Sequence, residues 1–219
     1  MSSIASRLAA PRIAILSAAL VALTGCASGG GAASVPASPA ATAAASSCPK
    51  SQPAALPAGQ KRIVTINTIK GSIAITVEGS LSPIAAGNFV ALASCGFYNG
   101  VVFHRLVPGF VIQGGDPDGT GAGGPGYEIQ DEPVTAQYHR GVVAMARTAA
   151  PNSQGSQFFI VLADAAARPL VQANTYAIFG EVTSGMETVD AIAAMPNSGE
   201  PNNAALQPVA MDSVTVSQP

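Results

Sequence analysis

FHRLVPGFVIQGGD, residues 103–116, is the stretch that determines how the rest of the chain is organised. Short apolar runs flank Pro108-Gly109, a dipeptide typical of turns, so the stretch predicts two adjoining strands. A hairpin brings the side chains of its two strands close together. The sequence therefore places Arg105, Phe110 and Gln113 near one another, as a cation and an amide beside an apolar ring.

The segment before this hairpin predicts a second hairpin and a helix. Residues 62–77 alternate between apolar and polar side chains, and the apolar ones are Val64, Ile66, Ile73, Ile75 and Val77. Lys70-Gly71 supplies the turn between the two strands. Ser82 and Pro83 are a typical N-cap and first-turn proline, so a helix is expected over residues 83–94.

The segment after the hairpin predicts more short strands and one further helix. Buried strands are expected over residues 141–146, 156–162 and 176–179 and around 209–216. Residues 184–195 have apolar side chains at helical spacing, and Pro196 follows. Many short strands with two isolated helices predict a mainly β fold in which helices cap a closed sheet.

Composition limits the size and the partners of the protein. The 219 residues are 48% hydrophobic and 10% charged, which suits one folded domain with a substantial core. The first 25 residues contain two arginines and no acidic residue, so the formal net charge of −2 becomes −4 without them. We therefore expect no nucleic-acid binding through overall charge.

The N-terminus has the layout of a secretory signal that ends at a cysteine. Two arginines precede an apolar run over residues 13–23, and LTGC follows at residues 23–26. The run is too short for a membrane-spanning helix, which needs about 20 residues. LTGC resembles the lipobox of bacterial lipoproteins, in which the cysteine is acylated and becomes the first residue.

Two hypotheses remain for this N-terminus. In the first, residues 1–25 are a lipoprotein signal peptide, and lipidated Cys26 anchors an exported protein to the cell membrane, facing outside the cytoplasm. In the alternative, an ordinary signal peptide is removed nearby and Cys26 is left free. Either hypothesis leads to an exported protein, in an oxidising setting.

The residues after Cys26 predict a tether. Residues 27–49 are mostly Ala, Ser, Gly and Pro without a charged residue, a composition that cannot bury enough apolar surface to fold. We expect a flexible segment over residues 26–60 and a folded domain over residues 61–219. Cys48 and Cys95 are an even pair that could form a disulfide or remain two free thiols.

Two other motifs are rejected. Residues 121–126 match the glycine pattern of dinucleotide-binding loops, but Pro125 and a strand-like segment follow where that site needs a helix. Asp116 and Asp118 resemble the start of a calcium loop, but the third acidic ligand and the closing glutamate are missing. We expect a solvated turn here, and neither a metal nor a cofactor.

The hairpin of residues 103–116 resembles the signature of the cyclophilin family of peptidyl-prolyl isomerases. Met145-Ala146, GSQFF at residues 155–159 and Phe179-Gly180 follow in the order and at about the spacing of that family, so the resemblance covers about residues 63–216. It implies an eight-stranded antiparallel barrel with a helix over each end. It also implies cis/trans isomerisation of X-Pro bonds in proline-containing polypeptides, here by a monomer in an exported lipoprotein form.

An arginine suits this reaction. Rotation about a peptide C–N bond is opposed by a barrier of roughly 18 to 20 kcal/mol, which comes from delocalisation of the nitrogen lone pair. A cation that hydrogen-bonds to the prolyl nitrogen as it becomes pyramidal stabilises the twisted state specifically. The resemblance gives this role to Arg105, with Gln113 and Phe110 as the other catalytic residues.

The resemblance also implies a set of substrate-binding residues. They are Phe103, His104, Val111, Met145, Ala146, Arg147, Gln157, Phe159, Leu170 and Tyr176. Phe110, Val111 and Phe159 are expected to line the pocket for the proline ring, with Leu170 as a fourth member. The backbone at Ala146 and Arg147 is expected to hydrogen-bond the substrate chain.

The chain departs from the family pattern at several positions. It contains no tryptophan, so the tryptophan at the pocket edge of many eukaryotic members is absent and tight cyclosporin binding is not expected. Tyr176 stands where many members have histidine. Arg147 replaces a common asparagine, and its charge is expected to favour substrates with acidic or polar groups beside the proline.

Two kinds of function remain open. The first is an active isomerase that assists the folding of exported proteins. The second is a binding or chaperone-like surface lipoprotein that grips proline-containing segments and turns them over only incidentally. Arg105 favours the enzyme, because binding alone does not require a cation beside the prolyl nitrogen.

Overall fold

The computed structural model describes residues 47–219. The predicted signal peptide, Cys26 and most of the predicted tether lie outside these residues. The strands are β1 (Lys61–Thr68), β2 (Gly71–Glu78), β3 (Val102–Val107), β4 (Val111–Asp116), β5 (Val142–Met145), β6 (Phe158–Val161), β7 (Ile178–Ser184), β8 (Ala204–Ala210) and β9 (Ser213–Ser217). The helices are α1 (Pro83–Ser94), η1 (Asp164–Ala166, a 3-10 turn), α2 (Ala167–Ala173) and α3 (Met186–Ala193).

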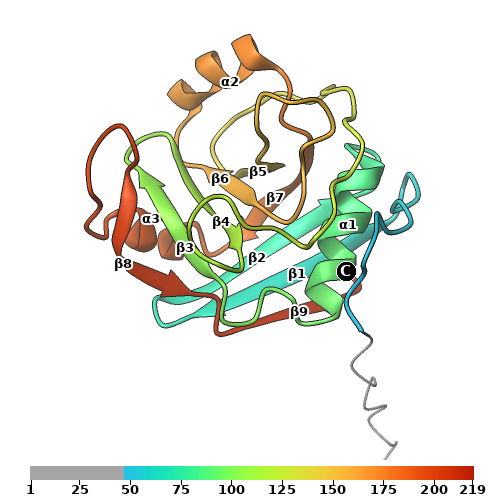
Figure 1. Ribbon diagram of the computed structural model, residues 1–219, viewed down its shortest axis with the longest axis horizontal. Coiled ribbons are helices and arrows are strands. Elements are labelled where there is room, and N and C mark those ends of the chain that lie inside the picture. Colours follow the sequence, from blue (N-terminus) through green and yellow to red (C-terminus); the bar gives the residue numbers. More distant parts are fainter. Residues whose placement is uncertain (1–46) are drawn as a thin grey trace, which may run out of the picture. The chain divides into compact units, whose positions relative to one another are not determined.

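The strands form one antiparallel sheet that closes on itself. Its order is β8-β3-β4-β6-β5-β7-β2-β1-β9, so β8 pairs with β3 at one edge and β9 pairs with β1 at the other. Only Met211 and Asp212 separate β8 from β9, and their N–H groups donate to Val101 O (2.9 Å) and Asn67 O (2.8 Å). One bent strand therefore bridges both edges of the sheet (Figure 1).

This bend explains why the structure has nine strands rather than eight. The sequence predicted a single last strand around residues 209–216, whereas the structure divides that region between β8 and β9. Counted as one bent strand, the two complete the expected barrel. The prediction of a mainly β, closed antiparallel fold is confirmed.

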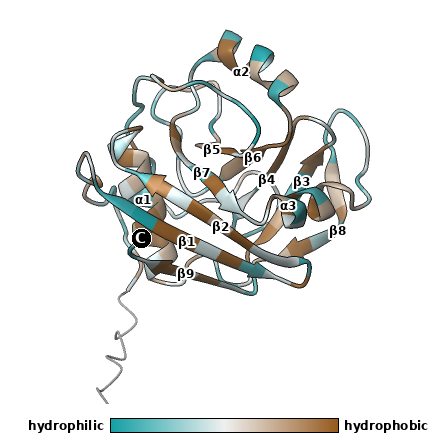
Figure 2. Ribbon diagram, turned by 180° about the vertical axis from the view of Figure 1, so that it is seen from behind, coloured by the Kyte–Doolittle hydropathy of each residue, from teal (hydrophilic) through white to brown (hydrophobic). Residues whose placement is uncertain are grey.

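The barrel interior holds the core that the alternation predicted. The five apolar side chains predicted for the first hairpin, from Val64 to Val77, are fully buried, and Figure 2 shows the alternation along β1 and β2. Phe89 of α1 packs its ring against Phe179 (4.7 Å between centroids), Phe158 (5.1 Å) and Tyr98 (5.2 Å). Aromatic pairs at these spacings contribute beyond the apolar area they bury.

Two helices lie over opposite sides of the barrel, α1 against β9 and β7, and α3 against β2 and β4 (Figures 1 and 2). Both were predicted, but α3 starts at Met186 rather than at residue 184 because Gly185 adopts a left-handed conformation (φ 89°). The helix α2 was not predicted. Its seven residues are too few to show a helical period in the sequence.

The first turn of α1 is capped by a distant residue. Ser82 precedes the helix, but its side chain makes no capping hydrogen bond. The carboxylate of Glu132 accepts hydrogen bonds from the N–H groups of Ile84 (2.9 Å) and Ala85 (2.8 Å) instead. A negative charge at this position also interacts favourably with the helix dipole.

Residues 48–60 contact the barrel, which corrects the prediction that the flexible tether continues to residue 60. The side chain of Leu56 is buried in the core, and its N–H donates to Pro83 O (2.9 Å). Gln52 accepts a hydrogen bond from the N–H of Gln130 (2.9 Å). Cys48 forms a disulfide with Cys95, with 5.1 Å between their Cα atoms. Within the described residues, the compact domain thus includes residues 48–60.

Candidate active site

A β-bulge at His104 decides which side chains of β3 reach the site. Phe103 pairs with Gly114 of β4 and Arg105 pairs with Gln113, so two steps along β3 match one step along β4. Side chains two apart on a regular strand point the same way. The extra residue turns Arg105 to the outer face and leaves Phe103 in the barrel interior.

Arg105 is held by two acceptors. Its Nε donates to Asn202 O (3.2 Å), and its Nη1 lies 3.4 Å from Gln113 Oε1. Gln113 Nε2 donates to Gln157 Oε1 (2.9 Å). Within residues 47–219, Nη2 of Arg105 has no hydrogen-bond acceptor, so the guanidinium keeps a donor for a ligand.

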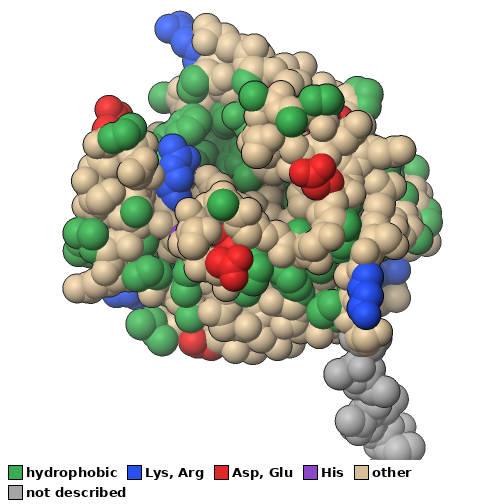
Figure 3. Space-filling model, in the orientation of Figure 1, with side chains coloured by type: hydrophobic (Ala, Val, Ile, Leu, Met, Phe, Trp, Pro, Cys, Tyr) green, Lys and Arg blue, Asp and Glu red, His purple; other side chains and the backbone are tan. Residues whose placement is uncertain are grey.

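The outer face of β4, β6 and β5 carries a second apolar cluster, separate from the barrel core. Val111, Phe159 and Leu170 are its buried members at the site, while Phe110 and Tyr176 are half-buried at its edge. The rings of Phe159 and Tyr176 meet edge to face, with 5.4 Å between centroids. Figure 3 shows a hollow lined by hydrophobic side chains next to a basic one on this face.

The register links this pocket to the polar residues. Gln113 pairs with Phe159 across β4 and β6, and Ala144 of β5 pairs with Phe159 on its other side. Arg105, Gln113 and Phe159 therefore lie on three successive strands of one face. The structure brings together the apolar side chains that the sequence predicted for the pocket, including Leu170 of α2.

Two predicted substrate-binding residues lie in the core instead. Phe103 and Met145 are both fully buried among the residues of the barrel interior. Phe103 points inward because of the bulge, and Met145 because it stands next to Ala144 on a strand, where neighbours face opposite ways. Neither side chain reaches the pocket, so we assign both to packing.

His104 lies beneath the loop that follows β4. It is 7% exposed, and neither ring nitrogen has a hydrogen-bond partner. Burial lowers the pKa of His104, and the nearby Arg105 lowers it further, whereas Asp116 opposes the shift. The neutral form of the ring is therefore favoured. The side chain of His104 lies beside this loop rather than in the pocket.

Asp116 organises the glycine-rich loop. Its buried carboxylate accepts hydrogen bonds from the N–H groups of Asp118 (2.8 Å), Thr120 (2.9 Å) and Gly121 (2.6 Å). Burial alone would raise the pKa of Asp116, but these bonds lower it. Any Cβ at Gly123 would overlap the carboxylate, so the glycine allows the loop to wrap around it. Asp116 is thus not in the solvated turn that the sequence predicted.

This loop forms one wall of a groove of about 720 Å³ beside the arginine. The groove is lined by residues 121–128 of this loop and, from another part of the chain, by residues 146–148, 153 and 155–157, together with Gln113. Gln157 Nε2 donates to Gly121 O (3.0 Å) and Gly123 O (2.9 Å), which ties the loop to the Gln113–Arg105 network. Three predicted substrate-binding residues, Ala146, Arg147 and Gln157, line this groove.

Sequence reasoning missed Asn202, whose carbonyl holds Arg105, and Asp131, which pairs with Arg147 (3.0 Å). Both lie in loops without a periodic pattern, so no local signal marks them.

Within residues 47–219, no three His, Cys, Asp or Glu side chains gather as metal ligands would. In the same part of the chain, no helix has the length and hydropathy needed to cross a membrane.

A fixed cation thus lies beside an apolar cluster on the outside of a closed antiparallel barrel, an arrangement suited to binding a small apolar group next to the arginine. The model of the family described as cyclophilin type peptidyl-prolyl cis-trans isomerase/CLD matches residues 63–216. The chain belongs to this family.

Individual relatives are similar over 61% to 72% of the chain. A probable peptidyl-prolyl cis-trans isomerase A from Mycobacterium leprae is 38% identical, over 72% of this chain and 93% of its own length. The peptidyl-prolyl cis-trans isomerase-like 3 of Rattus norvegicus is 42% identical, over 61% and 83% respectively. A Cryptosporidium parvum cyclophilin, crystallised in the presence of the dipeptide Ala-Pro, has a TM-score of 0.63 and 33% identity, over 72% of this chain and 99% of that one.

Proposed function

We propose that this peptidyl-prolyl cis-trans isomerase acts on X-Pro bonds of exported polypeptides without forming a covalent intermediate. Family membership supports the activity. The observation that carries the mechanism is the position of Arg105, which two acceptors fix next to the apolar pocket. A hydrogen bond from its guanidinium to the prolyl nitrogen stabilises the twisted bond and costs little reorganisation.

The energy required is within reach of such a site. Spontaneous isomerisation takes on the order of 100 seconds, and a turnover of roughly 10 to 1,000 per second lowers the barrier by about 4 to 7 kcal/mol. A hydrogen bond from a charged donor supplies roughly 1.5 to 3 kcal/mol of this. Orientation of the substrate contributes the rest.

The pocket provides this orientation. Val111, Phe159 and Leu170 hold the proline ring, and Phe110 closes its edge. The carbonyl before the proline then swings while the ring stays fixed. The similar Cryptosporidium parvum isomerase was crystallised in the presence of the dipeptide Ala-Pro, which supports proline-containing peptides as substrates.

Phe110→Ala is expected to lower kcat/KM for a short Ala-Pro peptide roughly 10-fold, because part of the apolar surface that holds the ring is lost. Phe110 is half-buried, so the barrel core stays intact. Isomerisation of the peptide is followed in a stopped-flow assay. Ile69→Ala, at a 78% exposed position in the turn between β1 and β2, is the matched control. An unchanged kcat/KM for Phe110→Ala would mean that this ring does not contribute to the pocket.

We further propose that the protein is a monomeric lipoprotein, anchored through Cys26 to the outer side of the cell membrane. Cys26 lies outside the described residues, so this proposal is supported by the LTGC motif and the apolar run before it. The disulfide of Cys48 with Cys95 is in keeping with an oxidising compartment.

Cys26→Ser is expected to release the protein from the membrane fraction, because the acyl chains that hold it are no longer attached. Fractionation of cells that express each form, followed by immunoblotting, measures the change. Cys48→Ser/Cys95→Ser, which leaves no unpaired thiol from the bridge, serves as the control for loss of cysteines elsewhere. A Cys26→Ser protein that still sediments entirely with membranes would contradict the lipid anchor.

A further inference from the structure

The guanidinium of Arg147 is paired within the protein itself. Its side chain is only 10% exposed, and Nη1 lies 3.0 Å from Asp131 Oδ2. The other two nitrogens donate to the chain's own carbonyls, Nε to Thr148 O (3.1 Å) and Nη2 to Ala150 O (2.6 Å). All three guanidinium nitrogens are thus engaged, and the expectation that Arg147 attracts acidic substrates is not supported.

Asp131, the partner of Arg147, also forms several hydrogen bonds with the same loop. Its carboxylate also accepts hydrogen bonds from the N–H of Asn152 (2.8 Å) and from Gln154 Nε2 (3.1 Å). In return, the N–H of Asp131 donates to Asn152 Oδ1 (2.8 Å). Asp131 therefore binds the loop of residues 147–154 at three points in addition to its ion pair.

The neighbouring residue fixes Asp131 to the rest of the fold. Glu132 caps the first turn of α1, so the segment that carries both acids is attached to a rigid helix. A backbone bridge between Ile129 and Gln154 joins the same two loops closer to the groove. The wall formed by residues 121–128 is thus attached to α1 through the segment that carries Glu132. The opposite wall is held in place by the contacts of Asp131 with Arg147 and its loop.

We propose that the Arg147–Asp131 pair is a clamp that sets the spacing of the groove walls and positions the backbone of residues 146–148 for an extended substrate. Arg147 is a positioning residue, because its guanidinium acts through the loop and not on the reacting bond. This proposal rests on the proposed function, since it assumes that a proline-containing chain occupies the pocket and continues into the groove.

The clamp makes activity depend on substrate length. A dipeptide-sized substrate fills the apolar pocket and makes few contacts with the groove walls. A longer peptide also needs the backbone groups between the walls, whose spacing the ion pair maintains. Loss of the clamp is therefore expected to weaken binding of long substrates and to leave the chemical step unchanged.

The test compares Arg147→Gln, Asp131→Asn and the double variant on two substrates. One is a short Ala-Pro peptide, and the other is the same sequence extended by several residues on both sides. For the extended peptide, KM is expected to rise roughly 5- to 10-fold in each single variant, as for loss of one charge-assisted contact. The double variant should be no worse than either single variant, because the residues act as one unit.

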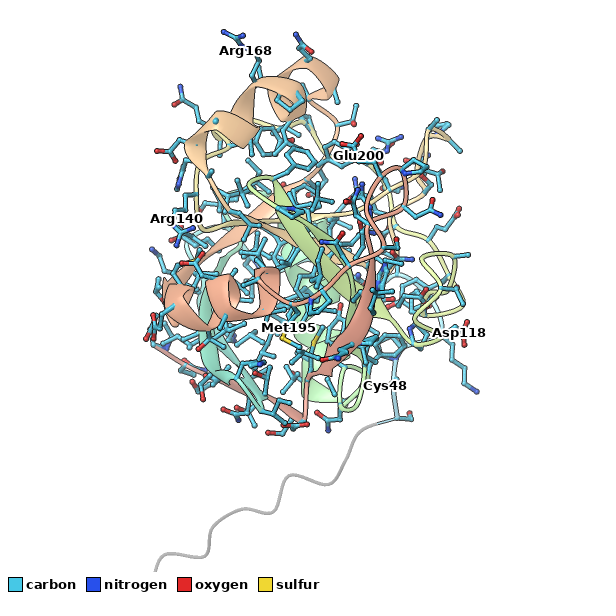
Figure 4. All side chains as sticks on the ribbon, turned by 90° about the vertical axis from the view of Figure 1, so that its left-hand side faces the viewer. Cys48, Asp118, Arg140, Arg168, Met195 and Glu200 are labelled. Carbon is cyan, nitrogen blue, oxygen red and sulfur yellow. A yellow bond between two sulfur atoms is a disulfide. The ribbon has the colours of Figure 1, made fainter. Side chains whose placement is uncertain are left out.

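The chain offers a matched control. Arg140 forms a bidentate ion pair with Asp190 of α3, and Figure 4 shows Arg140 on the side of the barrel opposite Asp118. Asp190→Asn removes an ion pair of the same kind without touching the groove, so both substrates should keep their KM. Arg147→Lys, which keeps the charge but loses the fork of donors, should recover part of the binding.

The outcomes separate the clamp from the proposed activity. An unchanged KM for the extended peptide, or an equal loss on both substrates, overturns the clamp. So does a double variant that shows the summed loss of both single variants. Absence of isomerisation by the unsubstituted protein on either peptide would instead overturn the proposed function. Thermal unfolding of each variant identifies any general loss of folding, and Arg147→Lys then provides the test in a folded protein.

Discussion

Arg105→Ala is expected to reduce kcat/KM for a short Ala-Pro peptide by roughly 10- to 150-fold, the equivalent of one hydrogen bond from a charged group. The loss should fall on kcat, because the prolyl nitrogen accepts this bond only as it becomes pyramidal in the twisted state. The fold should tolerate the change, since the side chain is half-buried on the outer face of β3 and not in the core.

Two measurements make this prediction specific. Arg105→Lys retains the charge without the planar donors, so its kcat should lie between that of Arg105→Ala and that of the unsubstituted protein. Binding of a proline-containing peptide, followed by calorimetry, should change much less than turnover in Arg105→Ala. Equal isomerisation rates for Arg105→Ala and the unsubstituted protein would refute the mechanism and favour the binding or chaperone-like alternative.

The central hairpin shows what the sequence can predict. The Pro108-Gly109 turn and the alternation around it were enough to place Arg105 near Gln113, which the register confirms. The same alternation predicts that Phe103 faces the same way as Arg105. The bulge at His104 reverses this, and it arises from pairing with both β4 and β8, which no local pattern encodes.

The pocket and the groove show a second limit. Leu170 was predicted from the family resemblance alone, and the packing of the short helix α2 places it in the same apolar cluster as Phe159. Arg147 was predicted from its alignment, but its partner Asp131 lies on another loop. An ion pair between two loops depends on tertiary structure. The sequence could therefore predict a charged residue at position 147 but not the group that it contacts.

The N-terminal boundary failed for a similar reason. Residues 48–60 have a composition typical of linkers. Only Leu56 and Cys48 connect this segment firmly to the domain, and neither contact can be predicted from composition. Leu56 enters the core beside α1, and Cys48 is bonded to Cys95 just beyond the end of that helix. A segment that contributes so little core needs a covalent link to stay in place.

Removal of this disulfide is expected to lower the free energy of unfolding by about 4 kcal/mol, the chain-entropy value for a loop of this length. The bridge spans 47 residues, which include β1, β2 and α1, so its loss frees a large part of the unfolded chain. Cys48→Ser/Cys95→Ser is the suitable variant, because it leaves no unpaired thiol from the bridge. Its unfolding in urea is compared with that of the unsubstituted protein.

The same variant should keep its activity on Ala-Pro peptides wherever it is folded, because the bridge joins the N-terminal segment to the end of α1 and makes no contact with Arg105 or the pocket. The unsubstituted protein treated with a thiol reductant should reproduce the loss of stability, which separates the bond from the substitutions. Equal urea midpoints for both proteins under oxidising conditions would mean that the bridge contributes no stability. Residues 48–60 would then be held by Leu56 and their hydrogen bonds alone.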